Sequence, residues 1–492
     1  MRIMKWNERY KEYLTDESGL RGACEEIIFP SSSDELRDCL KLDLQFTIQG
    51  SRTGIMGGAS PMGDGSDSRK AAILNLSRLQ NIAEVTIQNN ISYIRADAGA
   101  ALEDIQARLR KKHLFFPVEP TENTATIGGA FACNAKGLTS LKYGSCNDHV
   151  EGIELLTADG NLLTIPRGNY FFEEDGCPLP DGGFLSCRPL PCKKERIPLL
   201  PYKGMDLIDL FAGSEGTLGI LLSLNLRVIP IPPACWSLIF FFSDEKEALA
   251  FAGKLKTLPA GAGEILCAEF FDPLSLSLFR EAKEEQTSLA PLPDPPSGAT
   301  CAILLEAASH SEEAMEEFLF SLLEISEQSD EERTWASDSA IDKERFRSMR
   351  HCVPEKINQH IHAAQNKDPR IHKLALDLSG PPDQYEDYYD LYQKTLCECE
   401  VRGTICGHIL ENRLHVNFLP KDYGEFERAA DAASRLSDEI IKLGGCPCAE
   451  NGIGKIKRPL LKKYLTAKEQ ALQQTIKDFF DPHHKLGAGN IL

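Results

Sequence analysis

The chain has 492 residues, of which 42% are hydrophobic and 26% are charged. This length exceeds what a single hydrophobic core supports, so two or three domains are expected. The formal net charge of −19 argues against nucleic-acid binding. The sequence shows no transmembrane segment and no apolar secretory signal, which predicts a cytoplasmic protein and leaves open a peripheral place on the inner face of the membrane. Sixteen scattered cysteines without a C-x2-C motif are expected to be free thiols.

The first half of the chain is expected to contain short β-strands and one amphipathic helix. Alternating apolar residues predict strands at 72–76 and 92–96, a helix at 101–112, and a hairpin at 150–165. Residues 166–204 are rich in Gly, Pro and Cys and show little periodicity, so a long inserted loop is expected there.

A domain boundary is predicted at Pro230–Pro233, because this run interrupts the strand pattern. Strand and helix patterns alternate after it, and 283–298 is expected to be a linker. The alternation favours an α+β domain with an antiparallel sheet. The expected elements are strands at 237–242 and 301–306, helices at 245–258, 312–325, 384–397 and 423–443, and a tail that is helical up to Phe480.

Two glycine-rich segments carry the strongest functional signal. The first, GSRTGIMGGA from Gly50 to Ala59, follows an apolar strand, and the second, TIGGAFACNAKG, spans Thr126 to Gly137. Such turns expose backbone N–H groups and let the main chain approach an anion closely. The two segments could hold the two ends of one long diphosphate cofactor. The Rossmann and P-loop fingerprints are both absent.

His408 and His415 bracket the segment GHILENRLH. A four-residue hairpin loop at 410–413 would place the two imidazoles directly opposite each other, with Cβ atoms about 4.5–5.5 Å apart. A carboxylate could complete a three-ligand metal site. Glu450 is the first candidate and Glu411 the second, and a metal-free strand pair is the alternative.

These segments stand in order with YGSCNDHVEGIELLTADG, GSEGTLG, AENGIG and FDPHHKLGAGNIL. The set resembles the D-lactate/glycolate (D-2-hydroxyacid) dehydrogenase branch of FAD-linked flavoproteins of the vanillyl-alcohol-oxidase and p-cresol-methylhydroxylase (PCMH) type. The resemblance implies an α+β, two-domain flavoprotein. It has a PCMH-type FAD-binding domain at 1–230, a substrate cap with an antiparallel sheet at 231–448, and a segment at 449–492 that returns to the FAD domain.

The resemblance also implies non-covalent FAD and a set of residues that bind it: Gly50, Ser51, Arg52, Thr53, Gly54, Gly58, Pro120, Thr121, Thr126, Gly128, Gly129, Asn134 and Glu215. Ser51 and Arg52 stand where the family mostly has glycine. Arg52 could contact the diphosphate or could be solvated, and the sequence does not decide between the two.

In the cap, Arg350 and Lys373 match family residues that lie close to the substrate carboxylate, and a solvated helix arginine is the alternative for Arg350. The family has GEHGIG where this chain has AENGIG, so Asn451 replaces the histidine that removes the substrate proton. An amide cannot act as that base. The metal loop and the tail, GAGN in place of NPGK, also depart from the family pattern.

The leading hypothesis is therefore an FAD-dependent oxidoreductase that converts a D-2-hydroxy acid, such as D-lactate or glycolate, to the 2-oxo acid. Whether Zn, Mn or Fe assists at His408, His415 and Glu450 stays open. The alternative is an FAD-binding subunit with impaired chemistry that serves in electron relay or assembly, and an ether-lipid synthase is a weaker third reading. The resemblance implies a quinone, a cytochrome or a separate iron–sulfur subunit as electron acceptor, and leaves a homodimer open.

Overall fold

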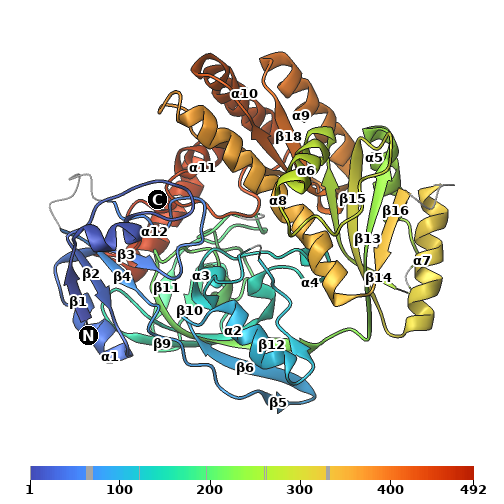
Figure 1. Ribbon diagram of the computed structural model, residues 1–492. Coiled ribbons are helices and arrows are strands. Elements are labelled where there is room, and N and C mark those ends of the chain that lie inside the picture. Colours follow the sequence, from blue (N-terminus) through green and yellow to red (C-terminus); the bar gives the residue numbers. More distant parts are fainter. Residues whose placement is uncertain are drawn as a thin grey trace. The chain divides into compact units, whose positions relative to one another are not determined.

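The computed structural model describes residues 2–62, 70–120, 122–194, 197–259, 261, 263–327 and 333–492, so the expected cofactor residue Thr121 lies outside the described residues. The chain forms two compact units (Figure 1). Unit 1 comprises Met1–Gly137, Gly144–Ile231 and Glu450–Leu492, and unit 2 comprises Leu138–Tyr143 and Pro232–Ala449. The expected boundaries at 230 and 448 lie next to Ile231 and Ala449, but the transfer of Leu138–Tyr143 to unit 2 was not expected.

The first sheet of unit 1 has the strand order β1-β2-β4-β3. Its strands are β1 (Arg2–Lys5), β2 (Glu26–Phe29), β3 (Leu44–Gln49) and β4 (Lys70–Asn75), with α1 (Ser33–Leu40) between β2 and β3. Strands β2 and β3 both run parallel to β4. Because ligands bind beyond the carboxyl ends of parallel strands, the end of β3 is the expected location of a binding loop.

The second sheet of unit 1 has the order β5-β6-β12-β8-β9, with β7 beside β12. These strands are β5 (Thr86–Gln88), β6 (Ile91–Asp97), β7 (Leu114–Phe115), β8 (Val150–Leu156), β9 (Leu162–Pro166) and β12 (Ile220–Pro230). The predicted helix is α2 (Leu102–Arg110), with Leu102, Ile105 and Leu109 buried. The predicted hairpin of β8 and β9 is also confirmed.

The expected loop at 166–204 contains a small antiparallel sheet of β10 (Gly176–Pro178) and β11 (Phe184–Ser186). The prediction of a structureless loop is therefore wrong for these strands. Cys177 and Cys187 are both buried there, which gives this short segment an apolar interior that its composition did not reveal.

Unit 2 is built on a seven-stranded sheet of order β16-β13-β15-β14-β18-β19-β17, and every neighbouring pair is antiparallel. The strands are β13 (Ala234–Phe242), β14 (Glu264–Phe271), β15 (Cys301–Ser309), β16 (Thr334–Ser337), β17 (Leu374–Ser379), β18 (Gly403–His408) and β19 (Arg413–Phe418). Alternating residues of each strand face opposite sides, so the sheet supports two apolar layers.

One face of this sheet packs against α5 (Glu245–Leu255), α7 (Glu312–Ser326), α9 (Tyr385–Cys399) and α10 (Tyr423–Lys442). The other face packs against α6 (Pro273–Glu285) and α8 (Ala340–Gln365). The antiparallel α+β cap was predicted correctly, but α6 and α8 were not expected, and the predicted linker at 283–298 begins inside α6. Charged residues and Pro354 interrupt the apolar pattern of α8, which hid this helix in the sequence.

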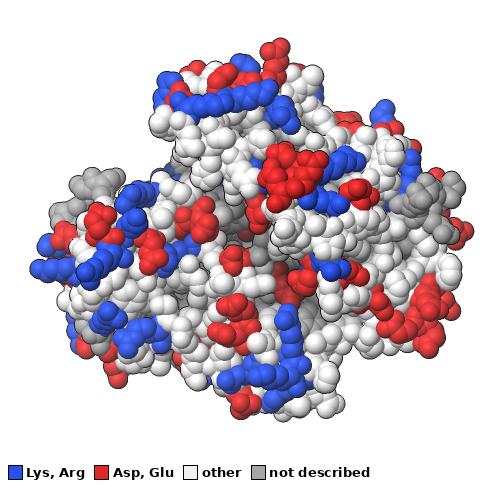
Figure 2. All heavy atoms as spheres, viewed as in Figure 1, with Lys and Arg blue, Asp and Glu red and all other residues white. Residues whose placement is uncertain are grey.

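On the face shown in Figure 2, acidic and basic side chains are mixed over the surface. Within the described part of the chain, we find no helix that has both the length and the apolarity needed to cross a bilayer.

The remaining helices of unit 1 are α3 (Ile127–Ala132), α11 (Arg458–Tyr464) and α12 (Ala467–Phe480), and unit 2 includes the short α4 (Ser140–Tyr143). After α12 the tail runs beside β3, where Phe46 N–H donates to Lys485 O (2.6 Å) and Gly487 N–H donates to Phe46 O (2.9 Å). Asp481, which is fully buried, accepts from the Lys477 ammonium (2.6 Å) and from the N–H groups of Lys485 and Leu486. The tail is thus part of the core of unit 1.

We predict that Asp481→Asn destabilises unit 1 by about 3 kcal/mol, because it leaves a buried ammonium without its anionic partner. Chemical denaturation followed by fluorescence measures this change. The matched control is Asp38→Asn, which breaks the exposed ion pair with Lys41 and should leave the midpoint unchanged. Equal midpoints for all three proteins would contradict the assigned role of Asp481.

Candidate functional site

The first glycine-rich segment, which follows β3, has an unusual one-sided hydrogen-bond pattern. Among the described residues, none of the backbone N–H groups from Ser51 to Gly58 donates to a protein acceptor. Gly54 and Ile55 are exposed to water, but the other six residues are buried or half-buried, where unpaired N–H groups are rare. Eight successive free donors in one loop are therefore a site that a bound anion would complete.

Four carbonyl groups of the same loop, by contrast, accept hydrogen bonds: those of Arg52, Met56, Gly57 and Gly58. Met56 O accepts from the N–H groups of Lys455 (3.0 Å) and Ile456 (3.2 Å). Gly57 O accepts from Lys455 Nζ (3.1 Å), and Gly58 O accepts from Asn490 Nδ2 (2.9 Å). These bonds hold the carbonyls on one side of the loop, so the C-terminal segment fixes the orientation of the donor-bearing side.

The second segment lies against the first. An added Cβ at Gly50 would stand 2.3 Å from Thr126 Oγ1, and Ser51 Oγ donates to Thr124 O (2.6 Å). Its own N–H groups, however, are satisfied: those of Ile127 and Gly128 donate to Ala100 O and Ala98 O. The prediction that both segments are open backbone cradles is wrong for the second one, which instead forms a tightly packed wall.

The other expected flavin residues of this wall are held by backbone contacts. Gly128 approaches the Ala98 backbone so closely that a Cβ would stand 2.7 Å from Ala98 O, and Gly129 N–H donates to Thr126 Oγ1 (3.2 Å). Pro120 is half-buried beside the undescribed Thr121. At Gly128 the missing side chain therefore permits close packing of the main chain, in place of the approach to an anion that the sequence suggested.

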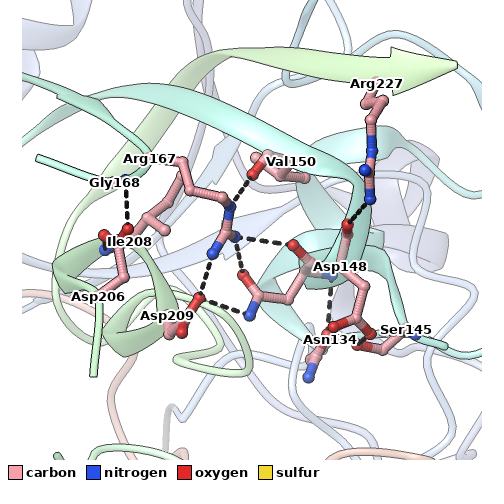
Figure 3. Close-up of polar contacts among 11 residues, drawn as sticks. Asn134, Ser145, Asp148, Val150, Arg167, Gly168, Asp206, Ile208, Asp209 and Arg227 are labelled. Carbon is pink, nitrogen blue, oxygen red and sulfur yellow. Dashed lines mark hydrogen bonds and ion pairs between the residues drawn. The ribbon is translucent and has the colours of Figure 1, made fainter. Parts of the chain in front are cut away.

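Asn134 is held in place by the polar network of Figure 3. Its backbone has φ 47°, and its Oδ1 accepts from Asn147 N–H (3.1 Å). Arg167 organises the network by donating to Asn147 Oδ1 (2.9 Å) and to Asp209 Oδ1 (2.8 Å). The hydrogen bond from Asn147 N–H to Asn134 Oδ1 fixes the orientation of the Asn134 side chain, and Arg167 holds Asn147 in place.

Two expected cofactor residues have specific protein partners. The Arg52 guanidinium lies over the Tyr13 ring, 4.3 Å from its centroid, on a backbone with φ 65°. Glu215 accepts from the N–H groups of Ile453 (2.6 Å) and Gly454 (2.7 Å). Desolvation raises the pKa of Glu215 to about 7 despite these bonds. Glu215 therefore anchors the NGIG loop, which is a supporting role.

In unit 2, the strand register differs from the one expected for the histidines. His408 pairs with Arg413, and Cys406 pairs with His415. The predicted direct opposition of His408 and His415 is wrong by two residues. Because a shift of two preserves the face, the two imidazoles are diagonal neighbours on one side of the sheet.

This face of the sheet carries an unusual number of buried charges. Glu306 accepts two hydrogen bonds from Arg347 (2.6 and 2.8 Å), and Glu269 accepts from Arg350 Nε (2.5 Å). Glu269 also lies 3.9 Å from His408 Nδ1. Arg350 is thus bound to a buried carboxylate of β14, and the alternative of a solvated arginine is ruled out.

The opposite edge of the same face pairs Asp377 with His415, whose Oδ1 and Nδ1 atoms lie 3.9 Å apart. The fully buried Arg413 forms an ion pair with Glu411 and donates to Ser140 Oγ (2.6 Å). Glu411 is therefore engaged by an arginine. Sequence reasoning missed Asp377 and Glu269, although Asp377 ends the segment HKLALD, which begins at His372 and shows an alternating strand pattern.

The remaining expected residues occupy different parts of the chain. The Lys373 ammonium donates to Asn358 Oδ1 (2.9 Å) in unit 2. Glu450 and Asn451 begin the part of unit 1 that follows Ala449. Ala449 N–H donates to Asp377 O (3.1 Å). Glu450 is the next residue in the chain after this hydrogen bond.

Fold and site together define a two-domain protein with an anion-binding loop in one unit and a buried polar sheet face in the other. A model for the FAD-binding domain matches residues 25–166, and a model for the C-terminal domain of FAD-linked oxidases matches residues 232–491. The chain belongs to the FAD-linked oxidase family, and the expected resemblance to its D-lactate/glycolate dehydrogenase branch is confirmed.

Three curated relatives illustrate this similarity. A D-lactate dehydrogenase of Anaerostipes hadrus is 23% identical and is aligned over 100% of this chain and 94% of its own length. A glycolate oxidase subunit of Bacillus subtilis is 23% identical, with 94% and 88% covered. A D-2-hydroxyglutarate dehydrogenase of Xanthomonas citri is 25% identical, with 90% and 83% covered.

Among solved structures, an alkyldihydroxyacetonephosphate synthase matches with a TM-score of 0.60 and 15% identity, covering 95% of this chain and 76% of that one. At this identity the likeness supports the fold. The residues of unit 1 fit FAD, since the loop at 51–58 offers free donors to a diphosphate and no histidine lies in it for a covalent link.

Two glycine variants distinguish an effect on protein stability from an effect on FAD binding. Gly50→Ala should lower both the unfolding midpoint and FAD retention, because its Cβ would collide with Thr126. Gly54→Ala has open space around its Cβ and should leave the apo-protein midpoint unchanged while it weakens FAD binding by about tenfold. Thermal unfolding of apo-protein and fluorescence titration with FAD measure the two effects. Unchanged FAD affinity in Gly54→Ala would contradict the assigned loop.

Proposed function

We propose that this protein is an FAD-dependent oxidoreductase that oxidises a D-2-hydroxy acid, such as D-lactate, glycolate or a related acid, to the 2-oxo acid. The observation that carries the proposal is the row of N–H groups at 51–58 that have no acceptor among the described residues, in a chain of the FAD-linked oxidase family. The names of the curated relatives supply the substrate class. FAD bound there would supply the two-electron acceptor for the substrate's hydride.

Lys373 is the residue that we assign to the substrate carboxylate. Arg350 is already neutralised by Glu269, whereas Lys373 donates to a neutral amide oxygen and forms no ion pair with a described carboxylate. An unneutralised ammonium attracts an anion more strongly than a paired guanidinium does. In this proposal Arg350 holds Glu269, which lies beside His408, and does not contact the substrate carboxylate directly as the sequence suggested.

The proton of the substrate hydroxyl needs an acceptor other than Asn451, because an amide does not titrate. Three histidines of the cap, His360, His362 and His372, are alternative bases. Two of them have other contacts, since His360 Nε2 lies 3.5 Å from Glu281 and His372 packs on Phe426. We therefore propose Asp377, His415 and Glu450 as ligands for a divalent Zn, Mn or Fe ion, which would lower the pKa of a bound hydroxyl. His408, which the sequence grouped with these ligands, is left out of the set because the carboxylate that it faces, Glu269, is already bound by Arg350.

A base placed at position 451 tests the site assignment. We predict that Asn451→His increases the rate of anaerobic flavin reduction by a D-2-hydroxy acid about 10²-fold, the lower end for a positioned general base. Absorbance near 450 nm follows the reaction, and Asn451→Gln is the control, since it changes size without adding a base. Equal rates for both variants would contradict the assignment.

The ligand set predicts different effects for the two histidines. His415→Ala should abolish metal retention, and His408→Ala should preserve it, because His415 belongs to the proposed ligand set, whereas His408 faces Glu269, a carboxylate bound by Arg350. Elemental analysis of dialysed protein gives the readout. Loss of metal in both variants would support the original pair of histidines instead.

A second candidate function is an FAD-binding subunit that has lost hydroxyacid oxidation and acts in electron relay or assembly. Asn451 and the neutralised Arg350 favour this alternative. The two functions are distinguished by adding saturating D-lactate, glycolate or D-2-hydroxyglutarate to the anaerobic holoprotein with zinc or manganese. Flavin bleaching supports the dehydrogenase, and a flavin that stays oxidised with all three acids supports the subunit.

A further inference from the structure

Lys455 occupies a distinctive position on the carbonyl side of the 51–58 loop. Its Nζ donates to Gly57 O (3.1 Å) and to Asn490 Oδ1 (2.7 Å), and its own N–H donates to Met56 O. Gly489 lies beside its side chain, since an added Cβ there would stand 3.4 Å from Lys455 Cε, an ordinary contact distance. The ammonium is therefore held against the loop by the tail of the chain.

The ammonium of Lys455 has no anionic partner in contact with it. Both of its acceptors are neutral amide oxygens, and no described carboxylate lies within salt-bridge distance of it. The surrounding charged groups are Glu215 and Asp16, which favour its charged form, and Arg458, which opposes it. A half-buried cation without a counter-ion is costly in the empty protein, so a bound anion would relieve that cost.

We propose that Lys455 is the cationic positioning residue of the cofactor site, which holds the 51–58 loop by Gly57 and neutralises the negative charge of the FAD diphosphate. This inference rests on the proposed FAD site and adds to it a residue from the far end of the chain. Neutral N–H groups alone leave the two diphosphate charges uncompensated, and within the loop Arg52 is directed to Tyr13. Lys455 supplies the missing charge.

Asn490 has a defined part in this arrangement. Its Oδ1 accepts from Lys455, while its Nδ2 donates to Gly58 O (2.9 Å) and Glu215 O (3.2 Å). The amide therefore connects the ammonium to the next residue of the loop. The departure of the tail from NPGK to GAGN places this amide, and not a lysine, beside Lys455, so a single cation serves the site.

The test measures FAD affinity of refolded or stripped apo-protein by fluorescence titration. We expect Lys455→Met to raise the Kd for FAD about tenfold, because the positive charge that offsets the diphosphate from the carbonyl side of the loop is lost. Lys462→Met, which removes an exposed lysine of α11, is the matched control and should leave the Kd unchanged. The double variant Lys455→Asn with Asn490→Lys exchanges the two hydrogen-bonded residues. It restores one cation to the site and should recover most of the affinity for FAD.

A pH series, run on the unmodified protein and on Lys455→Met, distinguishes the effect of charge from that of packing. Burial lowers the pKa of Lys455 to about 8. A bound anion favours the ammonium form and raises that pKa, so FAD binding takes up a proton above pH 8. The affinity of the unmodified protein should therefore be full below pH 8 and fall as the pH rises above it. Lys455→Met should lose this dependence, while the contributions of Glu215, Asp16 and Arg458 remain in both proteins.

The outcomes separate this inference from the function on which it rests. Weaker binding in Lys455→Met, with recovery in the double variant and a flat pH profile in the single variant, supports the proposal. Equal Kd values and equal pH profiles in the unmodified protein and Lys455→Met overturn it and leave the FAD site intact. An unmodified protein that takes up no FAD overturns both the proposed function and this inference.

Discussion

The structure depends on the separation of donors and acceptors in the loop that follows β3. In the part of the chain that the structure describes, the N–H groups from Ser51 to Gly58 find no acceptor, while the carbonyls of Met56, Gly57 and Gly58 are all bound. A peptide loop cannot keep this polarity alone, because unpaired carbonyls and N–H groups would rotate to satisfy each other. The C-terminal segment prevents that rotation, which explains why residues more than 390 positions away in the chain belong to the same unit.

The cap shows a different solution to the placement of polar groups. Its sheet buries Glu306, Glu269, Asp377 and Arg413 on the face that α6 and α8 cover. Buried charges are stable only when they are paired, and removing one partner destabilises the fold because it leaves an uncompensated buried charge. The arginines of α8 provide the pairs for Glu306 and Glu269, so this helix fixes the electrostatics of the face as well as its packing.

The sequence was a good guide to this fold wherever the signal is local. Glycine-rich turns, alternating strands and the amphipathic α2 follow from residues close together in the chain. The histidine register could not be predicted with the same certainty, because loops at 409–412 and 410–413 have equal length. The deciding residue is Asn412, which adopts φ 46° and ends the loop one position earlier; asparagine tolerates this left-handed conformation. Contacts such as Arg350 with Glu269 join distant segments and leave no local signal.

Amide hydrogen exchange of the 51–58 loop, with and without FAD, tests the central claim most directly. Free N–H groups exchange quickly, and hydrogen-bonded groups exchange slowly. The account predicts fast exchange for these amides in the apo-protein and strong protection when FAD is added, while the bonded amides of β3 stay protected in both states. If the loop is already protected without FAD, or stays unprotected in a protein that has bound it, the account is wrong.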